Sequence, residues 1–165
     1  MKTAIIFYSR TGNTRHIAKI LEEKIKEKKT YVDAIEIKAE KRPNYLKAGF
    51  VGMKQKELPI KNMNVDLKKY DGIIIGSPIW SWHICPYLKT FFNQAKNIKG
   101  KNAVVYITCG GGIEKQPKAI GPFLEYLKSI DMKPIGASLA LQMRKEEIKD
   151  GKQNIDGFIE KILSK

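Results

Sequence analysis

Short apolar runs alternate with helical patterns from one end of the chain to the other, and this alternation restricts the fold more than any other feature. The apolar runs predict five strands, at residues 4–8, 30–37, 72–75, 103–108 and 135–141. Helical spacing predicts helices at residues 15–28, 86–96 and 117–129, and a last helix that carries Ile155, Phe158, Ile159 and Ile162. Strands that alternate with helices usually form a parallel sheet covered on both faces, so we expect an α/β fold.

Right-handed crossovers limit the order of five parallel strands in one sheet. The order 2-1-3-4-5 of a doubly wound sheet is the most natural one here, and ligands then bind at the carboxyl ends of strands 1 and 3.

At 165 residues the chain is long enough for a single domain, residues 1–165. Residues 38–64 are too long for an ordinary connection, so we expect a partly helical insertion or a flap between strands 2 and 3.

The chain is strongly basic, with 31 Lys and Arg against 17 Asp and Glu and a formal net charge of +14. This charge favours anionic partners. The lysines lack the interleaved aromatics of a nucleic-acid surface, so we expect a solvated basic face and no nucleic acid.

No apolar run reaches 18 residues, which predicts no membrane span and a cytoplasmic protein. The spacing of Cys85, Cys109 and the two histidines predicts no metal site.

A polar turn follows the first strand and precedes the first helix. It consists of Ser9, Arg10, Thr11, Gly12, Asn13 and Thr14. Hydroxyls, a carboxamide, a glycine and the free N–H groups of a helix start can bind a phosphate without a lysine. The G-x-x-x-x-G-K-[ST] and G-x-G-x-x-G motifs are absent. Simple capping by Asn13 or Thr14 is the alternative, but the turn holds more polar groups than a cap needs.

Two more loops at the same edge of the predicted sheet carry residues suited to a ligand. Residues 76–86 follow strand 3 and place Trp80 and Trp82 in what we expect to be an exposed loop, where tryptophan is costly unless it stacks on something. Residues 108–112 follow strand 4, and their three glycines allow close approach of a flat ligand edge. Tryptophans packed under the insertion and a mobile glycine loop are the alternatives. Together with the polar turn, these loops predict a ring nucleotide with one phosphate.

These motifs resemble those of the flavodoxin family. Residues 8–14 are similar to its phosphate loop, residues 76–80 to its second flavin loop, and residues 108–112 take the place of the third. The resemblance implies the short-chain flavodoxin-like fold and a noncovalently bound FMN, with Trp80 or Trp82 against the isoalloxazine ring and no catalytic side chain. The cofactor-binding residues that it implies are Ser9, Arg10, Thr11, Gly12, Asn13, Thr14, Ser77, Pro78, Ile79, Trp80, Ser81, Trp82, Thr108, Cys109, Gly110, Gly111 and Gly112.

The basic charge departs from the acidic electron shuttles of that family and shapes the functional hypothesis. The leading hypothesis is an FMN-binding electron-transfer protein that exchanges electrons with an acidic redox protein such as a ferredoxin. The alternative is an NAD(P)H-dependent FMN oxidoreductase that reduces a quinone or another small acceptor, with Lys54 and Lys56 near the nucleotide phosphates. A flavin-free binding module is a third class. The sequence is compatible with a monomer and with a homodimer.

Overall fold

The computed structural model describes residues 1–62, 64–111 and 117–164. Its five parallel strands confirm the predicted order: β2 (Tyr31–Glu36), β1 (Lys2–Phe7), β3 (Gly72–Trp80), β5 (Asn102–Cys109) and β6 (Lys133–Arg144). Two short strands were not expected. The first, β7 (Glu147–Asp150), pairs antiparallel with β6, and the second, β4 (His83–Ile84), pairs antiparallel with β3.

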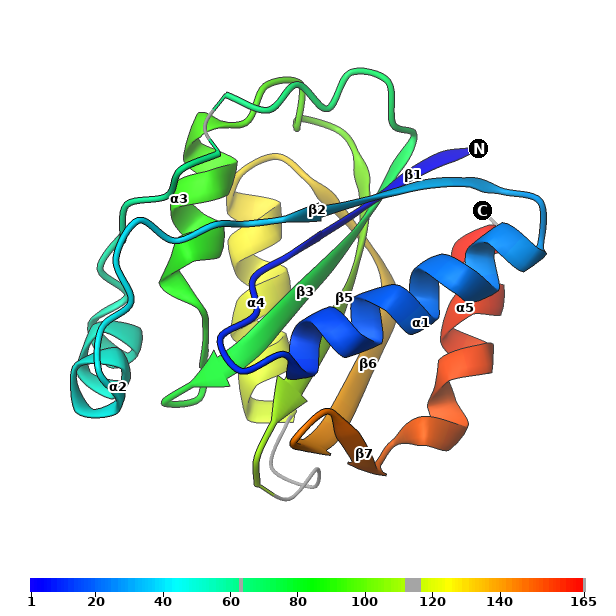
Figure 1. The fold of residues 1–165 in the computed structure, drawn as a ribbon. Coiled ribbons are helices and arrows are strands. Elements are labelled where there is room, and N and C mark those ends of the chain that lie inside the picture. Colours follow the sequence, from blue (N-terminus) through cyan, green and yellow to red (C-terminus); the bar gives the residue numbers. More distant parts are fainter. Residues whose placement is uncertain (63, 112–116, 165) are drawn as a thin grey trace.

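Helices cover both faces of this sheet (Figure 1). On one face lie α1 (Asn13–Glu27) and α5 (Ile155–Leu163), the latter preceded by the 3-10 turn η2 (Lys152–Asn154). On the other lie α3 (Pro86–Gln94) and α4 (Pro117–Ser129). Ile5 of β1 belongs to the core under α1 and α5, whereas Ile6 belongs to the opposite core, because successive strand residues point to opposite faces. Burial on both faces explains why the central strands are apolar without interruption.

The third strand is longer than its apolar run suggested. The prediction of a strand over 72–75 and an exposed loop after it was wrong, because β3 continues to Trp80 and pairs with β5 as far as Pro78. Gly76 lies inside the strand, where the ring of Tyr106 fills the space that a side chain would take. Trp80 is only 7% exposed, whereas Trp82, in the turn before β4, is 49% exposed.

The 38–64 segment, for which we expected a partly helical insertion or a flap, contains α2 (Tyr45–Lys54). The side chain of Asn44 caps α2 by accepting a hydrogen bond from the N–H of Lys47 at 2.9 Å. Gly52 allows α2 to approach the end of β3 closely, since a Cβ at this position would lie 2.8 Å from the Cβ of Trp80. The insertion therefore packs beside the carboxyl end of β3.

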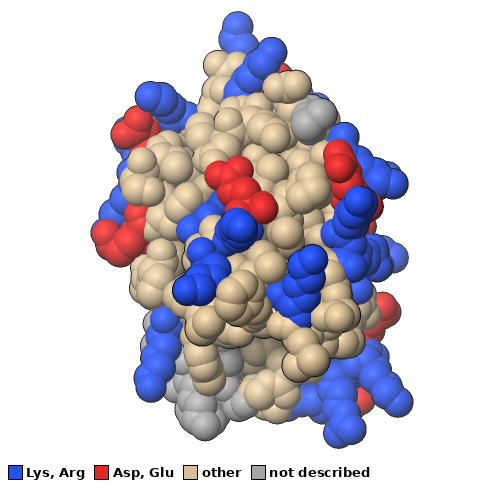
Figure 2. Space-filling view, turned by 90° about the vertical axis from the view of Figure 1, so that its left-hand side faces the viewer, with Lys and Arg blue, Asp and Glu red and all other residues tan. Residues whose placement is uncertain are grey.

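The face that carries α2 and α3 shows how the positive charge is distributed (Figure 2). Lys and Arg side chains lie around the edges of this face and also across its middle, with a few small groups of Asp and Glu among them. Among the residues that the structure describes, no helix has the length and apolar character needed to cross a membrane.

Asp33 on the edge strand β2 should make stability depend on acid pH. Hydrogen bonds from Lys69 and Tyr70 lower the pKa of its carboxyl group to about 2. Because this pKa lies below that of the unfolded chain, the stabilisation is present above about pH 4 and is lost as the pH falls toward 2. The side chain is 35% exposed, so solvent screening limits the effect to at most about 1 kcal/mol.

We therefore expect Asp33→Asn to lower the free energy of unfolding at pH 6 and to change it progressively less toward pH 3. Urea titrations across this range measure the difference. The control is Asp131→Asn, which removes an exposed carboxylate paired with Lys99. A difference between wild type and Asp33→Asn that stays constant from pH 6 to pH 3 would contradict the prediction.

Candidate functional site

A pocket of about 370 Å³ lies at the carboxyl ends of β1, β3 and β5, where the strand order predicted a ligand site. This volume falls within the range of about 300–1,000 Å³ that small-molecule sites occupy. The wall is formed by the polar turn, the ends of β3 and β5, and one side of α2. The lining residues are Arg10, Thr11, Asn13, Thr14, Tyr45, Ala48, Gly49, Pro78, Ile79, Trp80, Thr108, Cys109 and Gly110.

The polar turn leads into α1, and the N-cap residue of this helix is Gly12, which has no side chain to cap it. Gly12 precedes α1 with a φ of 96°, a left-handed conformation that favours glycine, and its carbonyl accepts the N–H of His16 at 2.8 Å. The buried hydroxyl of Ser9 accepts the N–H of Arg15 at 3.2 Å. Ser9 thus holds the turn against the helix, and the start of α1 directs its positive dipole end toward the pocket.

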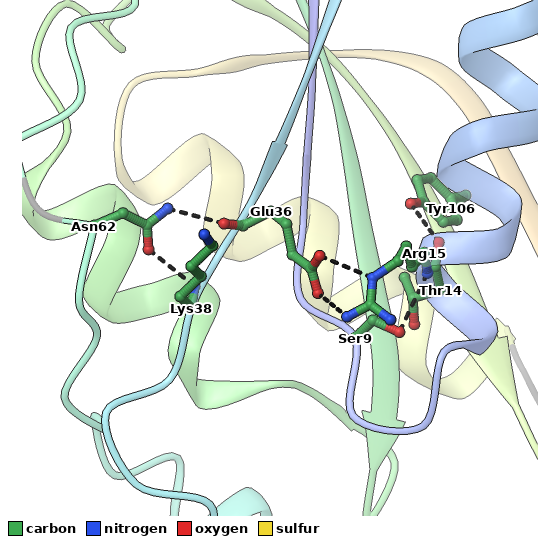
Figure 3. A network of polar contacts seen from close by, with 7 residues as sticks. All are labelled: Ser9, Thr14, Arg15, Glu36, Lys38, Asn62 and Tyr106. Atoms are coloured by element: carbon green, nitrogen blue, oxygen red, sulfur yellow. Dashed lines mark hydrogen bonds and ion pairs between the residues drawn. The ribbon is translucent and has the colours of Figure 1, made fainter.

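The start of α1 rests on β5 through two buried contacts. The hydroxyls of Thr14 and Thr108 are hydrogen-bonded at 2.8 Å, and the hydroxyl of Tyr106 donates to the carbonyl of Thr14 at 3.1 Å. Figure 3 shows Tyr106 reaching the first turn of α1 beside Arg15. These contacts couple the position of the turn to the central strands, which are buried on both faces.

Breaking the hydroxyl pair should weaken both the fold and the site. Thr108→Val retains the shape of the side chain but leaves the buried Thr14 hydroxyl without this partner, which we expect to cost about 1–2 kcal/mol in urea unfolding. The double variant Thr14→Val/Thr108→Val leaves neither hydroxyl behind. It should therefore lose less stability than the sum of the two single changes, and strict additivity would contradict the coupling.

Trp80 lines the pocket and belongs to an aromatic cluster with Tyr8 and Tyr87, which are not among the lining residues. Trp80 meets Tyr8 and Tyr87 edge to face, each at a centroid distance of 6.0 Å, and Tyr8 and Tyr87 lie 4.5 Å apart. Burial raises the pKa of Tyr87 to about 12 and that of Tyr8 further still, so both phenols are neutral at physiological pH. This cluster is a rigid apolar surface and supplies no acid or base near neutrality.

Arg10 lies at the mouth of the pocket between aromatic rings. Its guanidinium is 4.2 Å from the ring centroid of Tyr45 and 5.6 Å from that of Trp80. One nitrogen, Nη1, is buried and has no hydrogen-bond partner in the structure. A buried donor without a partner is costly, so this atom suits an acceptor on a bound ligand.

The contribution of α2 was not predicted residue by residue. Tyr45 and Gly49 line the pocket, whereas Phe50 and Met53, which also lie on the insertion, are exposed outside it. Two sequence features could have indicated this helix: the length of the 38–64 segment, and Asn44, a good capping residue directly before the helix. Which face of this helix meets the pocket depends on its packing against Trp80.

Ten of the seventeen residues that the flavodoxin resemblance implied line this pocket: Arg10, Thr11, Asn13, Thr14, Pro78, Ile79, Trp80, Thr108, Cys109 and Gly110. Ser9 and Gly12 shape the polar turn behind it. Ser77, Ser81, Trp82 and Gly111 are not among the lining residues, and Gly112 lies outside the described residues. The hydroxyl of Ser77 accepts the N–H of Cys85 at 2.9 Å, and that of Ser81 donates to the carbonyl of Gly49 at 3.0 Å.

Several other sequence features lie apart from this site. His83 lines a separate cavity with Lys89 and Tyr126. Cys85 and Cys109 are not joined in a disulfide, and the thiol of Cys109 donates to the backbone carbonyls of Gly111 and Leu141. In residues 1–62, 64–111 and 117–164, no group of three or more His, Cys, Asp and Glu side chains is arranged to hold a metal ion.

Solved structures share this fold along almost the whole chain. A flavoprotein from Lactobacillus acidophilus in complex with FMN is 22% identical with a TM-score of 0.70, over 95% of this chain and 97% of that one. Flavodoxin 2 from Bacillus cereus is 21% identical with a TM-score of 0.67, over 100% of both chains. A candidate flavoprotein from Bacteroides eggerthii is 20% identical with a TM-score of 0.73, over 99% of both chains. No curated protein matches the sequence.

The fold and the pocket define a flavodoxin-like, FMN-binding flavoprotein. Residues 1–143 match the model of the NADPH-dependent FMN reductases, and the chain belongs to this family. The resemblance found in the sequence is thereby confirmed at the level of fold and cofactor.

The pocket residues fit FMN on features of the structure itself. The left-handed Gly12 and the other N–H groups in the first turn of α1, apart from that of Arg15, can donate to a phosphate. The unpartnered Nη1 of Arg10 suits an acceptor atom, and the Trp80 cluster provides an apolar surface for a ring. Thr108 and Gly110 form the remaining edge.

Proposed function

We propose that the protein is an NAD(P)H-dependent FMN oxidoreductase that reduces a quinone or another small acceptor. Membership of the NADPH-dependent FMN reductase family carries this proposal. FMN, when bound, accepts a hydride from a nicotinamide and passes electrons on to an acceptor. The pocket lining adds support, because Tyr45 lines the pocket and is 73% exposed, so its aromatic side chain is accessible to a flat substrate.

In this function the side chains bind and orient, and the cofactor does the chemistry. The polar turn from Ser9 to Thr14 would hold the FMN phosphate, and Pro78 to Trp80 with Thr108 to Gly110 would border the ring. Arg10 would place one positive charge beside it. Among the described residues that line the pocket, none is a carboxylate or an imidazole, so protons for the acceptor would come from solvent.

The lack of an acid or base among these lining residues also favours a second candidate, an electron carrier. A carrier needs no proton-transferring side chain, and the net charge of +14 would accelerate encounters with an acidic redox protein. The two candidates differ in whether NADPH reduces the flavin directly.

The test is an anaerobic titration of the FMN-loaded protein, followed by the visible flavin absorbance. We expect stoichiometric NADPH to bleach the flavin bands within seconds, and a quinone to restore them. Flavin bands that respond to dithionite but stay unchanged for minutes with excess NADPH would reject the reductase and favour the carrier. A protein that binds no FMN would reject both.

Arg10 should raise the reduction potential of the bound flavin. A unit charge about 10 Å away contributes roughly 1.7 kcal/mol at an effective dielectric constant near 20, which favours the anionic reduced form. Arg10→Gln removes the charge and should lower the midpoint potential by some tens of millivolts in a dye-coupled titration. Lys118→Gln, an exposed residue of α4, is the charge-matched control. Equal potentials in the Arg10 variant and the control would contradict this role.

A further inference from the structure

A second pocket, of about 270 Å³, lies beside the end of β2 and is strongly basic. We call it the β2-end pocket and define it by its charged residues, Arg15, Glu36, Lys38, Arg42 and Lys61. Four cations thus surround one carboxylate. None of these residues lines the 370 Å³ pocket at the ends of β1, β3 and β5, which we call the flavin pocket, so the cluster is separate from the candidate FMN site.

The carboxylate of Glu36 is already engaged within this pocket. Arg15 binds it through two parallel hydrogen bonds, Nε to Oε2 at 2.8 Å and Nη2 to Oε1 at 2.6 Å. Figure 3 shows the two side chains facing each other across the space between α1 and β2. This pairing raises the pKa of Arg15, chiefly through its hydrogen bond to Glu36. Because the charge of Glu36 is compensated by Arg15, it repels other anions only weakly.

The other three cations have no ion pair among the described residues, although the backbone places two of them next to each other. The N–H of Lys61 donates to the carbonyl of Lys38 at 2.8 Å. The side chain of Asn62 accepts the N–H of Lys38 and donates to the carbonyl of Glu36, each at 2.9 Å (Figure 3). A well-connected backbone therefore holds like charges together, an arrangement that an anion between them would stabilise.

The β2-end pocket borders the flavin pocket through two short stretches of chain. Thr14 lines the flavin pocket and Arg15, the next residue, lines the β2-end pocket. Arg42 precedes Tyr45 of the flavin pocket by three residues, and the hydroxyl of Tyr87, which packs behind Trp80, donates to the carbonyl of Lys41. The two pockets are therefore joined by continuous backbone at these two stretches, which a ligand that extends from one pocket to the other would pass.

We propose that the β2-end pocket binds the terminal 2′-phosphate of the nicotinamide nucleotide and makes the protein prefer NADPH to NADH. The pocket is smaller than the flavin pocket and has no aromatic lining residue, so it suits a terminal phosphate rather than a base. A phosphomonoester carries close to two negative charges near pH 7, which three uncompensated cations match. The proposal rests on the proposed function in taking a nicotinamide nucleotide as the ligand.

The first test is binding of 2′,5′-ADP and of 5′-AMP to the FMN-loaded protein by isothermal titration calorimetry. We expect 2′,5′-ADP to bind at least tenfold more tightly, and Lys38→Gln/Lys61→Gln to abolish this difference while FMN occupancy stays unchanged. The control Lys118→Gln/Lys161→Gln removes the same charge from exposed positions on α4 and α5 and should change binding less than twofold. Equal binding of the two nucleotides, or a pocket variant that behaves as the control does, would overturn the proposal.

Kinetics supply a second readout and separate this proposal from the proposed function. In the pocket variant, Lys38→Gln/Lys61→Gln, the KM for NADPH should rise about tenfold toward the KM for NADH. The kcat should stay unchanged, because the 2′-phosphate lies away from the nicotinamide ring that reacts. If the protein oxidises no NADPH but the pocket variant still loses 2′,5′-ADP selectively, the reductase function fails and the phosphate site stands. Normal NADPH oxidation with an unchanged preference for NADPH in the variant would reject the site alone.

Discussion

Replacement of Gly12 by alanine is expected to weaken FMN binding by about tenfold to a hundredfold. The residue has a φ of 96°, where a side chain costs about 1–3 kcal/mol of backbone strain, and an added Cβ would overlap the carboxylate of Glu146. Both effects displace the turn that begins α1. Quenching of FMN fluorescence on titration with apoprotein measures the change in dissociation constant.

Two further variants separate the causes of this loss. Gly121→Ala in α4 is the matched control, since no atom lies within 4 Å of an added Cβ and FMN affinity should stay unchanged. Gly12→Ala/Glu146→Ala removes the overlapping carboxylate but not the backbone strain, so it should recover the affinity only in part. FMN binding by Gly12→Ala within twofold of wild type would show that the turn tolerates a side chain and would contradict the argument.

The largest loss of stability is expected for Gly76→Ala in the centre of β3. A Cβ at this position would overlap the ring of Tyr106, which is completely buried in β5 and cannot move aside without disturbing the core. Overpacking of this kind costs about 1–3 kcal/mol, and the central position of β3 favours the upper end. Because Tyr106 also bonds to Thr14, we expect FMN affinity to fall along with the urea midpoint.

The same strand supplies the control for this change. Gly72→Ala alters β3 four residues earlier, where the nearest atom to an added Cβ is the carbonyl oxygen of Asn102 at 3.9 Å, so the cost should stay below about 1 kcal/mol. Combining Gly76→Ala with Tyr106→Leu makes room for the methyl group and should cost clearly less than the sum of the single changes. Additive losses would mean that the ring is not the obstacle.

Local patterns were sufficient for most of the architecture. Uninterrupted apolar runs in β1 and β5 report burial on both faces of a parallel sheet, and the turn from Ser9 to Thr14 carries its polar chemistry in consecutive residues. Features of this kind are encoded within a few neighbouring positions. They could therefore be predicted, together with the strand order and the presence of a pocket at the ends of β1 and β3.

The end of β3 shows where such patterns fail. Gly76, Ser77 and Pro78 are typical turn residues, yet they continue the strand, because Tyr106 occupies the place of a side chain at Gly76 and β5 pairs onward to Pro78. The turn between β6 and β7 was missed for a related reason. Lys145 and Glu146 both have positive φ without the usual glycine or asparagine, and the side chain of Asn13 accepts the N–H of Glu146 at 2.8 Å.

By itself the sequence determined the order of the elements, the parallel sheet and the polar turn proposed to hold the phosphate, since each depends on periodicity or on adjacent residues. Only the tertiary structure decided that Trp80 is buried while Trp82 is exposed, that α2 turns Tyr45 toward the flavin pocket, and that Lys38, Arg42 and Lys61 meet Arg15. These outcomes depend on contacts between segments far apart in the chain, whose packing no local pattern encodes.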